Sequence, residues 1–289
     1  MASHDQRATL QQIDNPTEKR CVALVALKRT DMAKSRLTMV PGPLRRRLAW
    51  TMALDTLRAL TAVLPVIVIS NQPQLAARLS REQISARVLA ESVTAGMNAA
   101  LRQGEKAAAI AGFSSTLACV GDLPALRPDS IRAVLAAAIN GRRAFVADAS
   151  GTGTTMLIAS DTELQPHFQG RSAAGHRESG AVALGAAELG GPLADARRDV
   201  DSEVDLYDAY FIGLGPSTAQ LFDPQGRLGR YELIMADDAQ PGETQHAVTA
   251  SGDRVTIPAG ALGQGKAGPG GQRLHAVVSD SQVLSAWLE

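Results

Sequence analysis

The feature that most constrains the fold is an alternation of short apolar runs with segments of helical spacing. Each run is too short for a buried helix, and several are rich in valine or isoleucine, which favours strands. The runs that we expect to form strands are 21–27, 66–70, 87–89, 116–120 and 144–147. Apolar strands joined by helices are typical of a parallel sheet that helices cover on both faces. We therefore predict an α/β fold in three layers, built on a mostly parallel sheet.

Two of the intervening segments have the spacing of amphipathic helices. One lies between the first two runs, where apolar residues recur every three or four positions and arginines occupy the other face. Its apolar positions are Leu44, Leu48, Met52, Leu57, Leu60 and Leu64. The other is 130–139, with the sequence SIRAVLAAAI. A strand, a helix and a second parallel strand in this order form a right-handed crossover almost without exception.

Composition excludes several classes of protein. Lys+Arg and Asp+Glu both number 29, so no overall charge favours nucleic acid or an anionic membrane as a partner. No stretch approaches the roughly 20 apolar residues of a membrane span, and residues 1–20 lack the apolar centre of a signal peptide. Cys21 and Cys119 lie in apolar runs, which favours buried thiols over a disulfide. We expect a cytoplasmic globular protein; whether it forms a homo-oligomer stays open.

Three loops that follow predicted strands carry chemically useful residues. The first, after 21–27, holds four cations, namely Lys28, Arg29, Lys34 and Arg36. The second is Gly121-Asp122-Leu123-Pro124, and the third brings Asp148 and then the turn 151–155, GTGTT. Ligands of such sheets bind at the carboxyl ends of the strands, where these loops would meet. Carboxylates, glycine-rich turns and cations together suit Mg²⁺ and phosphate, although a solvated turn rich in lysine would also explain the first loop.

A further pair of carboxylates, Asp199 and Asp201, flanks Val200 in the segment RRDVDSEVDL. Alternation predicts that both carboxylates lie on one face and Val200 on the other. Asp122 precedes Pro124, which ends strand pairing, so we expect its carboxylate to face the cleft. Structural alternatives stay open, since Asp122 could cap a turn and the later pair could form a solvated strand end.

Six segments of the chain, in this order, resemble the guanylyltransferases of coenzyme F-420 biosynthesis. They are Lys28, 33–37 (AKSRL), 121–126 (GDLPAL), 151–154 (GTGT), Ser172 with His176, and 198–201 (RDVD). The resemblance covers about residues 20 to 220 and is closest to the actinobacterial branch, the phosphoenolpyruvate guanylyltransferases; archaeal relatives are 2-phospho-L-lactate guanylyltransferases. It implies a fold of the nucleotide-diphospho-sugar transferase type. Similar GDLP turns also occur in molybdopterin and sugar-phosphate nucleotidyltransferases.

The resemblance implies a role for individual residues. Those implied in catalysis are Lys28, Lys34, Arg36 and Asp122. Those implied in holding Mg²⁺ are Asp122, Asp199 and, as a weaker candidate, Asp201. Those implied in binding the nucleotide are Lys28, Lys34, Glu91 and Asn98, although Asn98 could equally cap a helix. Those implied in binding the second substrate are Thr154, Gly170 and Ser172.

Two positions near the second substrate fit the family pattern less closely. Relatives tend to have a glycine directly after the residue that matches Phe168, whereas here Gln169 separates Phe168 from Gly170. A lone histidine such as His176 is more often structural than a substrate contact.

The function implied by the resemblance is Mg²⁺-dependent transfer of GMP from GTP to phosphoenolpyruvate. A low aromatic content of 3% also favours a small acid over a pterin as the second substrate, because a pterin needs a stacking platform. Three alternatives stay open: transfer to 2-phospho-L-lactate, a nucleotidyltransferase for molybdopterin or a sugar phosphate, and a non-catalytic nucleotide-binding protein.

Residues beyond about 222 lie outside the resemblance. The segment 223–230, DPQGRLGR, looks like a linker, and short strand-like runs then surround the glycine-rich segment 263–272. We predict a flexible segment 1–20, a nucleotidyltransferase domain 21–221 and a small β-rich extension 222–289.

Overall fold

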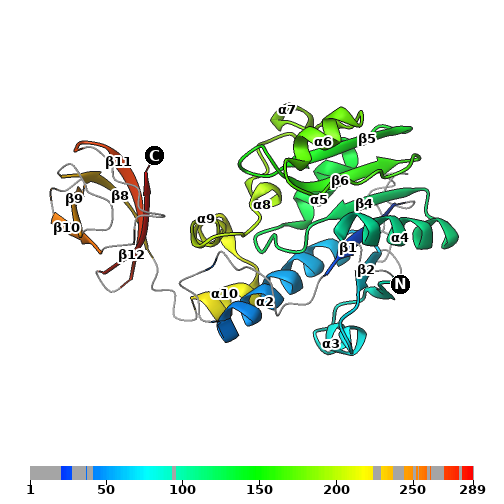
Figure 1. The fold of residues 1–289 in the computed structure, drawn as a ribbon, viewed down its shortest axis with the longest axis horizontal. Coiled ribbons are helices and arrows are strands. Elements are labelled where there is room, and N and C mark those ends of the chain that lie inside the picture. Colours follow the sequence, from blue (N-terminus) through cyan, green and yellow to red (C-terminus); the bar gives the residue numbers. More distant parts are fainter. Residues whose placement is uncertain are drawn as a thin grey trace, which may run out of the picture.

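The computed structural model describes residues 21–27, 37, 42–92, 96–223, 229–236, 244–249, 252, 254–258, 261, 270–279 and 282–288. They form a seven-stranded sheet between helices and a separate five-stranded sheet nearer the C-terminus (Figure 1). The strands of the larger sheet are β1 Cys21–Ala26, β2 Val66–Ser70, β3 Arg87–Ala90, β4 Ser115–Cys119, β5 Arg142–Ala147, β6 Thr154–Ser160 and β7 Val182–Ala183. The predicted three-layer α/β class is confirmed.

The larger sheet is mixed, with the strand order β3-β2-β1-β4-β6-β5-β7. β1 pairs in parallel with β2 and β4, and β2 pairs in parallel with β3. β6 is antiparallel to both β4 and β5, which gives β5 the same direction as β1 to β4. The prediction that Thr154 and Thr155 lie in a turn is wrong. The turn ends at Gly153, and because so tight a turn can join only antiparallel strands, the two threonines open β6.

Both predicted helices are present. α2 spans Gly42–Thr61, and α5 spans Pro128–Ala136, beginning and ending earlier than predicted because Pro128 suits a first helical position. The other helices are α3 Leu75–Arg81, α4 Met97–Ile110, α6 Ser172–Glu178, α7 Ala186–Leu189, α8 Ala194–Arg197, α9 Glu203–Gly213 and α10 Pro216–Phe222. None of the described helices is long and apolar enough to cross a lipid bilayer.

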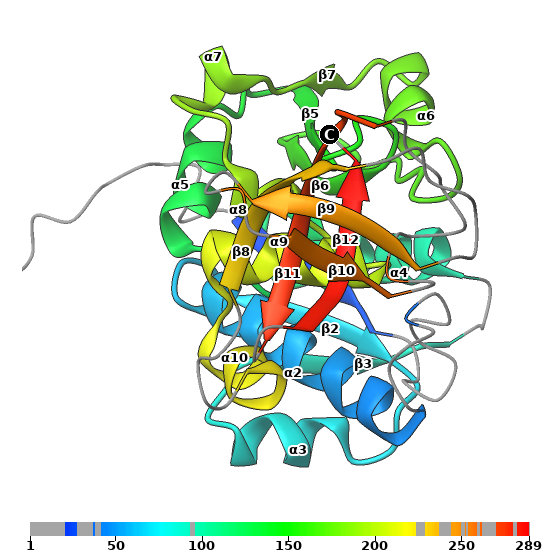
Figure 2. The same cartoon turned by 90° about the vertical axis from the view of Figure 1, so that its left-hand side faces the viewer.

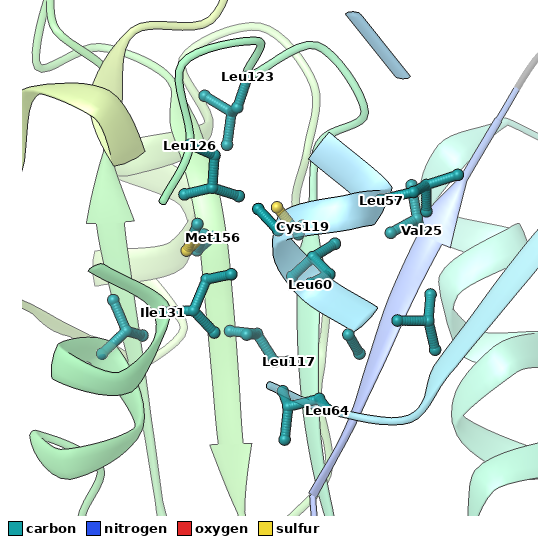
Figure 3. Packing of buried hydrophobic residues seen from close by; sticks show 14 of the residues in the cluster. Val25, Leu57, Leu60, Leu64, Leu117, Cys119, Leu123, Leu126, Ile131 and Met156 are labelled. Atoms are coloured by element: carbon teal, nitrogen blue, oxygen red, sulfur yellow. The ribbon is translucent and has the colours of Figure 1, made fainter. Parts of the chain in front are cut away.

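Separate hydrophobic cores lie on the two faces of the larger sheet, and alternate residues of β1 contribute to each. In the first core Leu60 of α2 lies near Cys119 and Leu117 of β4, and Leu57 of α2 lies near Val25 of β1 (Figure 3). Helices α4 and α6 contribute to the second core. Cys21 and Cys119 are buried free thiols, as predicted. Burial on both faces explains why these strands are apolar throughout.

A buried carboxylate fastens α10 to α2. Asp55 is 4% exposed and accepts hydrogen bonds from the backbone N–H groups of Ser217 (3.1 Å) and Thr218 (2.8 Å). These groups lie in the first turn of α10, where N–H groups have no partner within the helix. The negative charge also suits the positive end of the helix dipole. This contact makes α10 part of the same body as α2.

We expect Asp55→Ala to lower the free energy of unfolding by about 2–4 kcal/mol, because two buried N–H groups lose a charged acceptor. Urea unfolding of both proteins measures the difference. The matched control is Asp129→Ala: the Asp129 side chain is 95% exposed and pairs with Arg132 at 2.8 Å. Loss of an exposed pair should change stability by less than about 0.5 kcal/mol. A similarly small change in both variants would contradict the role of Asp55.

The smaller sheet confirms the predicted β-rich extension. Its antiparallel strands are β8 Gly229–Met235, β9 Gln245–Thr249, β10 Arg254–Ile257, β11 Arg273–Ser279 and β12 Gln282–Leu288, of which the sequence analysis did not single out β12. The order is β10-β9-β8-β11-β12, and β9 and β10 cross β11 and β12 in Figure 2. Ala286 of β12 donates to the carbonyl of Ala261, just after β10, at 2.8 Å, which brings the two edges together.

The predicted domain boundary lies close to a change of structure. α10 ends at Phe222 and β8 begins at Gly229, and none of the described strands is shared between the two sheets. Tyr210 of α9 donates to Asp223 at 2.8 Å, so residue 223 still contacts the larger body. The division into 1–20, 21–221 and 222–289 stays a prediction.

Candidate functional site

Strand direction brings the predicted loops to one edge of the larger sheet. Strands β1 to β5 run in one direction, so their carboxyl ends lie at that edge, and β6 begins there. Asp122 lies just beyond β4, Asp148 directly follows β5, and Thr154 opens β6. The expected convergence of the loops after β4 and β5 is therefore confirmed. Lys28, Lys34 and Arg36 lie outside the described residues, so their roles stay predictions.

One backbone hydrogen bond joins the segments that carry the predicted metal ligands. The N–H group of Val200 donates to the carbonyl oxygen of Asp122 at 3.1 Å. Val200 is fully buried, whereas Asp199 is half-buried and Asp201 is exposed, as the predicted alternation requires. The segment is irregular and does not form a strand, and α9 begins shortly after it, at Glu203. The two carboxylate-bearing segments therefore meet at the carboxyl edge.

The loop around Asp122 is also fastened to α2 and to the end of β1. The N–H group of Leu123 donates to the Thr56 hydroxyl of α2 at 3.0 Å. A Cβ atom added to Gly121 would lie 2.5 Å from Cδ2 of Leu27, so glycine lets this loop pack directly on the end of β1. These contacts fix the backbone of Asp122, while its side chain is only half-buried.

The donor set fits a magnesium ion that is bound together with phosphates. Asp122, Asp199 and Asp201 offer hard carboxylate oxygens, which Mg²⁺ prefers. No cluster of three or more His, Cys, Asp or Glu side chains able to hold a metal ion occurs in the part of the chain that the structure describes. Mg²⁺ is commonly held by one or two protein carboxylates and completed by substrate phosphates and water. The residues therefore suit an ion that arrives with a nucleotide rather than a permanent metal cage.

The short helix α8 directly precedes the segment 198–201, which contacts Asp122 through Val200, and α8 itself contacts the loop after β5 and the start of β6. Arg197 donates to the carbonyl oxygens of Ala147 (3.2 Å) and Asp148 (3.0 Å). The Thr155 hydroxyl donates to the carbonyl of Ala196 at 2.7 Å. Thr155 was predicted only as part of the glycine turn 151–155, and Arg197 was not predicted. The signal for Arg197 is its position next to the 198–201 segment.

Asp148 shapes the glycine turn. One oxygen of its carboxylate accepts from the N–H group of Thr152 (3.0 Å) and from the Ser150 hydroxyl (2.9 Å). A Cβ atom at Gly153 would lie 2.4 Å from the other oxygen, so a larger residue could not fit without a shift. This carboxylate is therefore occupied in closing the turn between β5 and β6.

The structure brings Thr154 and α6 together. Thr154 and Ser172 are both buried, with 6% and 5% exposure. The N–H group of Ala173 donates to the carbonyl of Thr152 at 3.1 Å, which docks the start of α6 on the glycine turn. Gly170 is exposed and has a φ of +57°, a left-handed conformation that favours glycine. Whether Gly170 contacts a substrate stays a prediction.

His176 of α6 is fully buried against Thr154. Its Nδ1 atom lies 2.9 Å from the Thr154 hydroxyl, and its Nε2 atom accepts from the N–H group of His167 at 2.9 Å. The ring of Phe168 packs edge-on, with centroids 5.0 Å apart. Burial, reinforced by the charges of His167 and Arg143, lowers the pKa of His176 to about 4. The ring is therefore neutral at physiological pH, and it is too buried to contact a substrate itself.

Glu91 and Asn98, two of the four residues predicted to bind the nucleotide, lie just after β3 and in the first turn of α4. Glu91 is half-buried, and its N–H group donates to the carbonyl of Ser70 at 3.2 Å. Asn98 lies in the first turn of α4, and its side-chain oxygen accepts from the N–H group of Phe168 at 2.8 Å. The N-cap of α4 is Gly96, so the alternative role of Asn98 as a helix cap is wrong. Nucleotide binding by either residue stays a prediction.

Comparison with known proteins gives several similar sequences. The family described as the MobA-like NTP transferase domain matches residues 43–187. The chain is 40% identical over 213 residues to the phosphoenolpyruvate guanylyltransferase of Geodermatophilus obscurus, covering 71% of this chain and 94% of that relative. It is 41% identical over 205 residues to the one of Salinispora arenicola, covering 68% and 91%. It is 36% identical over 211 residues to the one of Mycolicibacterium smegmatis, covering 72% and 92%.

A solved structure from Desulfovibrio desulfuricans, described as a nucleotide-diphospho-sugar transferase, has a similar fold. The TM-score is 0.51 at 14% sequence identity, and the match covers 70% of this chain and 94% of that one. At this identity the likeness concerns the fold alone. It agrees with the fold type that the sequence implies.

Proposed function

The chain belongs to the phosphoenolpyruvate guanylyltransferase family of MobA-like NTP transferases and is a nucleotidyltransferase, and we propose that its substrates are GTP and phosphoenolpyruvate. In the proposed reaction a GMP unit passes from GTP to the phosphate of phosphoenolpyruvate. The products are enolpyruvyl-diphospho-guanosine and pyrophosphate. We further propose that Mg²⁺ is the cofactor and that the product serves coenzyme F-420 biosynthesis.

The observation that carries this proposal is the Val200 to Asp122 hydrogen bond, which joins two carboxylate-bearing segments at the carboxyl edge of the sheet. Asp122 and Asp199 would hold Mg²⁺, and Asp201 is a weaker candidate. When bound, the ion supplies positive charge that offsets the charge of the phosphate oxygens. The protein must supply the rest of the positioning, because both substrates are anions that repel each other.

The proposed reaction needs no general base. The second pKa of a phosphate monoester lies near ~6, so the phosphate of the acid is largely a dianion at neutral pH. One of its oxygens attacks the α-phosphorus of GTP and forms the new P–O bond. The bond from the α-phosphorus to the oxygen that bridges to the β-phosphorus breaks, and its electron pair leaves with pyrophosphate. The chain contributes alignment and charge rather than proton transfer.

The proposed substrate contacts fall into three groups. The cations that would neutralise the triphosphate and the departing pyrophosphate are Lys28, Lys34 and Arg36. The residues that would hold the nucleoside are Glu91 and Asn98. The residues that would bind the anionic ends of the acid are Thr154, Gly170 and Ser172. The docking of α6 on the glycine turn supports a shared site for Thr154 and Ser172.

Pyrophosphate release tests the proposed function. With GTP and Mg²⁺ we expect turnover with phosphoenolpyruvate and weaker use of 2-phospho-L-lactate. The two acids differ only in whether the bond between their second and third carbons is double or single, and packing differences of this size are worth about 1–3 kcal/mol, or roughly 10-fold or more in kcat/KM. Chelation of Mg²⁺ should stop the reaction. Replacing GTP with ATP tests whether the guanine base is required.

Each other outcome would assign a different function. A preference for 2-phospho-L-lactate would make the chain a 2-phospho-L-lactate guanylyltransferase, like the archaeal relatives. Turnover with a sugar phosphate or molybdopterin, but with neither three-carbon acid, would make it a sister nucleotidyltransferase. GTP binding without pyrophosphate release from any acceptor would indicate a non-catalytic nucleotide-binding protein.

A further inference from the structure

A histidine that the proposed mechanism does not use is bonded at both ring nitrogens. His176 is 0% exposed, and its Nδ1 and Nε2 atoms face the Thr154 hydroxyl and the His167 N–H group, each at 2.9 Å. Thr154 opens β6, whereas His176 lies in α6, so the pair links the sheet edge to the helix that docks on it. A buried ring with two partners is held in a single orientation.

The two partners fix the tautomer of the ring. A backbone N–H group can only donate, so Nε2 of His176 must present its lone pair to His167. A neutral imidazole carries one proton, which is therefore on Nδ1. Nδ1–H then donates to the hydroxyl oxygen of Thr154, which acts as the acceptor of that hydrogen bond.

This direction decides what the Thr154 hydroxyl can still do. The hydroxyl proton of Thr154 cannot point at Nδ1 of His176, because Nδ1 already carries a proton. The hydroxyl proton must therefore point elsewhere. Within the described ranges, the Thr154 hydroxyl has no hydrogen-bond partner besides His176. A buried O–H donor without an acceptor is costly, so an acceptor is expected in the working protein.

We propose that His176 is a positioning residue, which holds the Thr154 hydroxyl so that its proton is donated to an anionic oxygen of the acid substrate. The proposal rests on the proposed function, because it takes Thr154 to be part of the acid site. Nδ1–H of His176 also polarises the hydroxyl, since a group that accepts one hydrogen bond donates a stronger second one. His176 thus acts on the substrate only through Thr154.

The surroundings of the ring keep it in the required state. Phe145 and Phe168 pack against it, with ring centroids 5.8 Å and 5.0 Å away. The charged or titratable neighbours that act on it are His167 and Arg143, and both disfavour a second proton; a hydrogen bond with the backbone of Ser172 favours one, but burial outweighs it. The burial that lowers its pKa to about 4 keeps the ring neutral well below the usual range of histidine. A second proton would also break the bond from His167.

Nitrogen NMR of the ¹⁵N-histidine-labelled wild-type protein tests the geometry without any turnover. We expect His176 to be the Nδ1–H tautomer and to stay neutral when the pH is lowered through the ordinary titration range of histidine. A ring protonated on Nε2, or one that titrates near its ordinary pKa, would overturn the proposal. This measurement does not depend on whether the chain transfers GMP.

Kinetics of single and double variants test the coupling. Thr154→Val should raise KM for phosphoenolpyruvate about 10-fold, because a hydrogen bond to an anion is lost, while KM for GTP stays within about 2-fold. His176→Phe, which keeps an aromatic ring, should raise the same KM about 5-fold. In the Thr154→Val background His176→Phe should add no further increase. His176→Asn, whose amide can donate in place of Nδ1–H, should recover most of the affinity.

The outcomes separate this inference from the proposed function. If His176→Phe raised KM for phosphoenolpyruvate by the same factor in the Thr154→Val background as in the wild type, His176 would act through another group, and the inference would be overturned. Equal rises in KM for both substrates would mean a general structural role and would also overturn it. In a protein without turnover, calorimetric binding of phosphoenolpyruvate that weakens in Thr154→Val and in His176→Phe, with no further loss in the double variant, would support the inference while the proposed function fails. Wild-type protein that does not bind the acid would overturn both.

Discussion

Asp122→Asn is expected to lower the rate of nucleotidyl transfer by about 10²-fold or more while leaving the fold intact. A bound metal ion contributes several kcal/mol of charge stabilisation in the transition state, and each 1.36 kcal/mol is a factor of about ten. Asparagine has nearly the same size but no negative charge. The bond from Val200 uses the main-chain carbonyl of Asp122, so the substitution preserves it. Pyrophosphate release at saturating GTP and phosphoenolpyruvate measures the loss.

A second measurement locates the defect at the metal. Binding of Mn²⁺ in the presence of GTP, followed by electron paramagnetic resonance, should weaken in Asp122→Asn. The control is Asp129→Asn, because Asp129 is an exposed carboxylate in the first turn of α5, and both metal binding and rate should be unchanged there. A folded Asp122→Asn protein with nearly the wild-type rate would remove Asp122 from the metal site.

The sequence predicts the fold class well because the buried strands are apolar on both sides. β2 was predicted with the bounds that the structure shows, and β1 and β4 within one residue. β6 was missed for a physical reason. The threonines that open it suit both a turn and a strand, and only the hydrogen bond between Asp148 and Gly153 decides where the turn ends. Pairing of this kind is a property of two segments, so neither segment alone reveals it.

The same limit applies to the candidate site. Carboxylates at strand ends stand out in the sequence, because the carboxyl edge of an α/β sheet is where ligands bind. The resemblance marks His176 but not its role, since that role depends on Thr154, 22 residues away, and on a backbone group of His167. Arg197 likewise acts on carbonyl groups about 50 residues earlier. Candidates for substrate contact can be proposed from residue type, whereas groups that position them require coordinates.

Lys34→Ala is expected to weaken binding of GTP by about 10- to 100-fold. The cationic loop starts where β1 ends, and the N–H group of Leu27 donates to the carbonyl of Ile69, so the chain enters this loop at the carboxyl edge of the sheet. Lys34 lies outside the described residues, and its role is inferred from the sequence. A charged hydrogen bond to a triphosphate is worth about 1.5–3 kcal/mol, which corresponds to the expected loss. Calorimetric titration with GTP measures it.

Comparison of GTP with guanosine distinguishes loss of a phosphate contact from damage to the loop. Guanosine lacks the triphosphate, so its affinity should change by less than about 2-fold in Lys34→Ala if the ammonium group binds phosphate. The control is Arg46→Ala, because Arg46 is an exposed cation on α2 and its loss should leave both affinities unchanged. High salt should reduce the difference in GTP affinity between the wild type and Lys34→Ala, since screening weakens a partly exposed ion pair. Equal losses for GTP and guanosine would show instead that Lys34 acts by shaping the loop, and the triphosphate would then need another cationic partner.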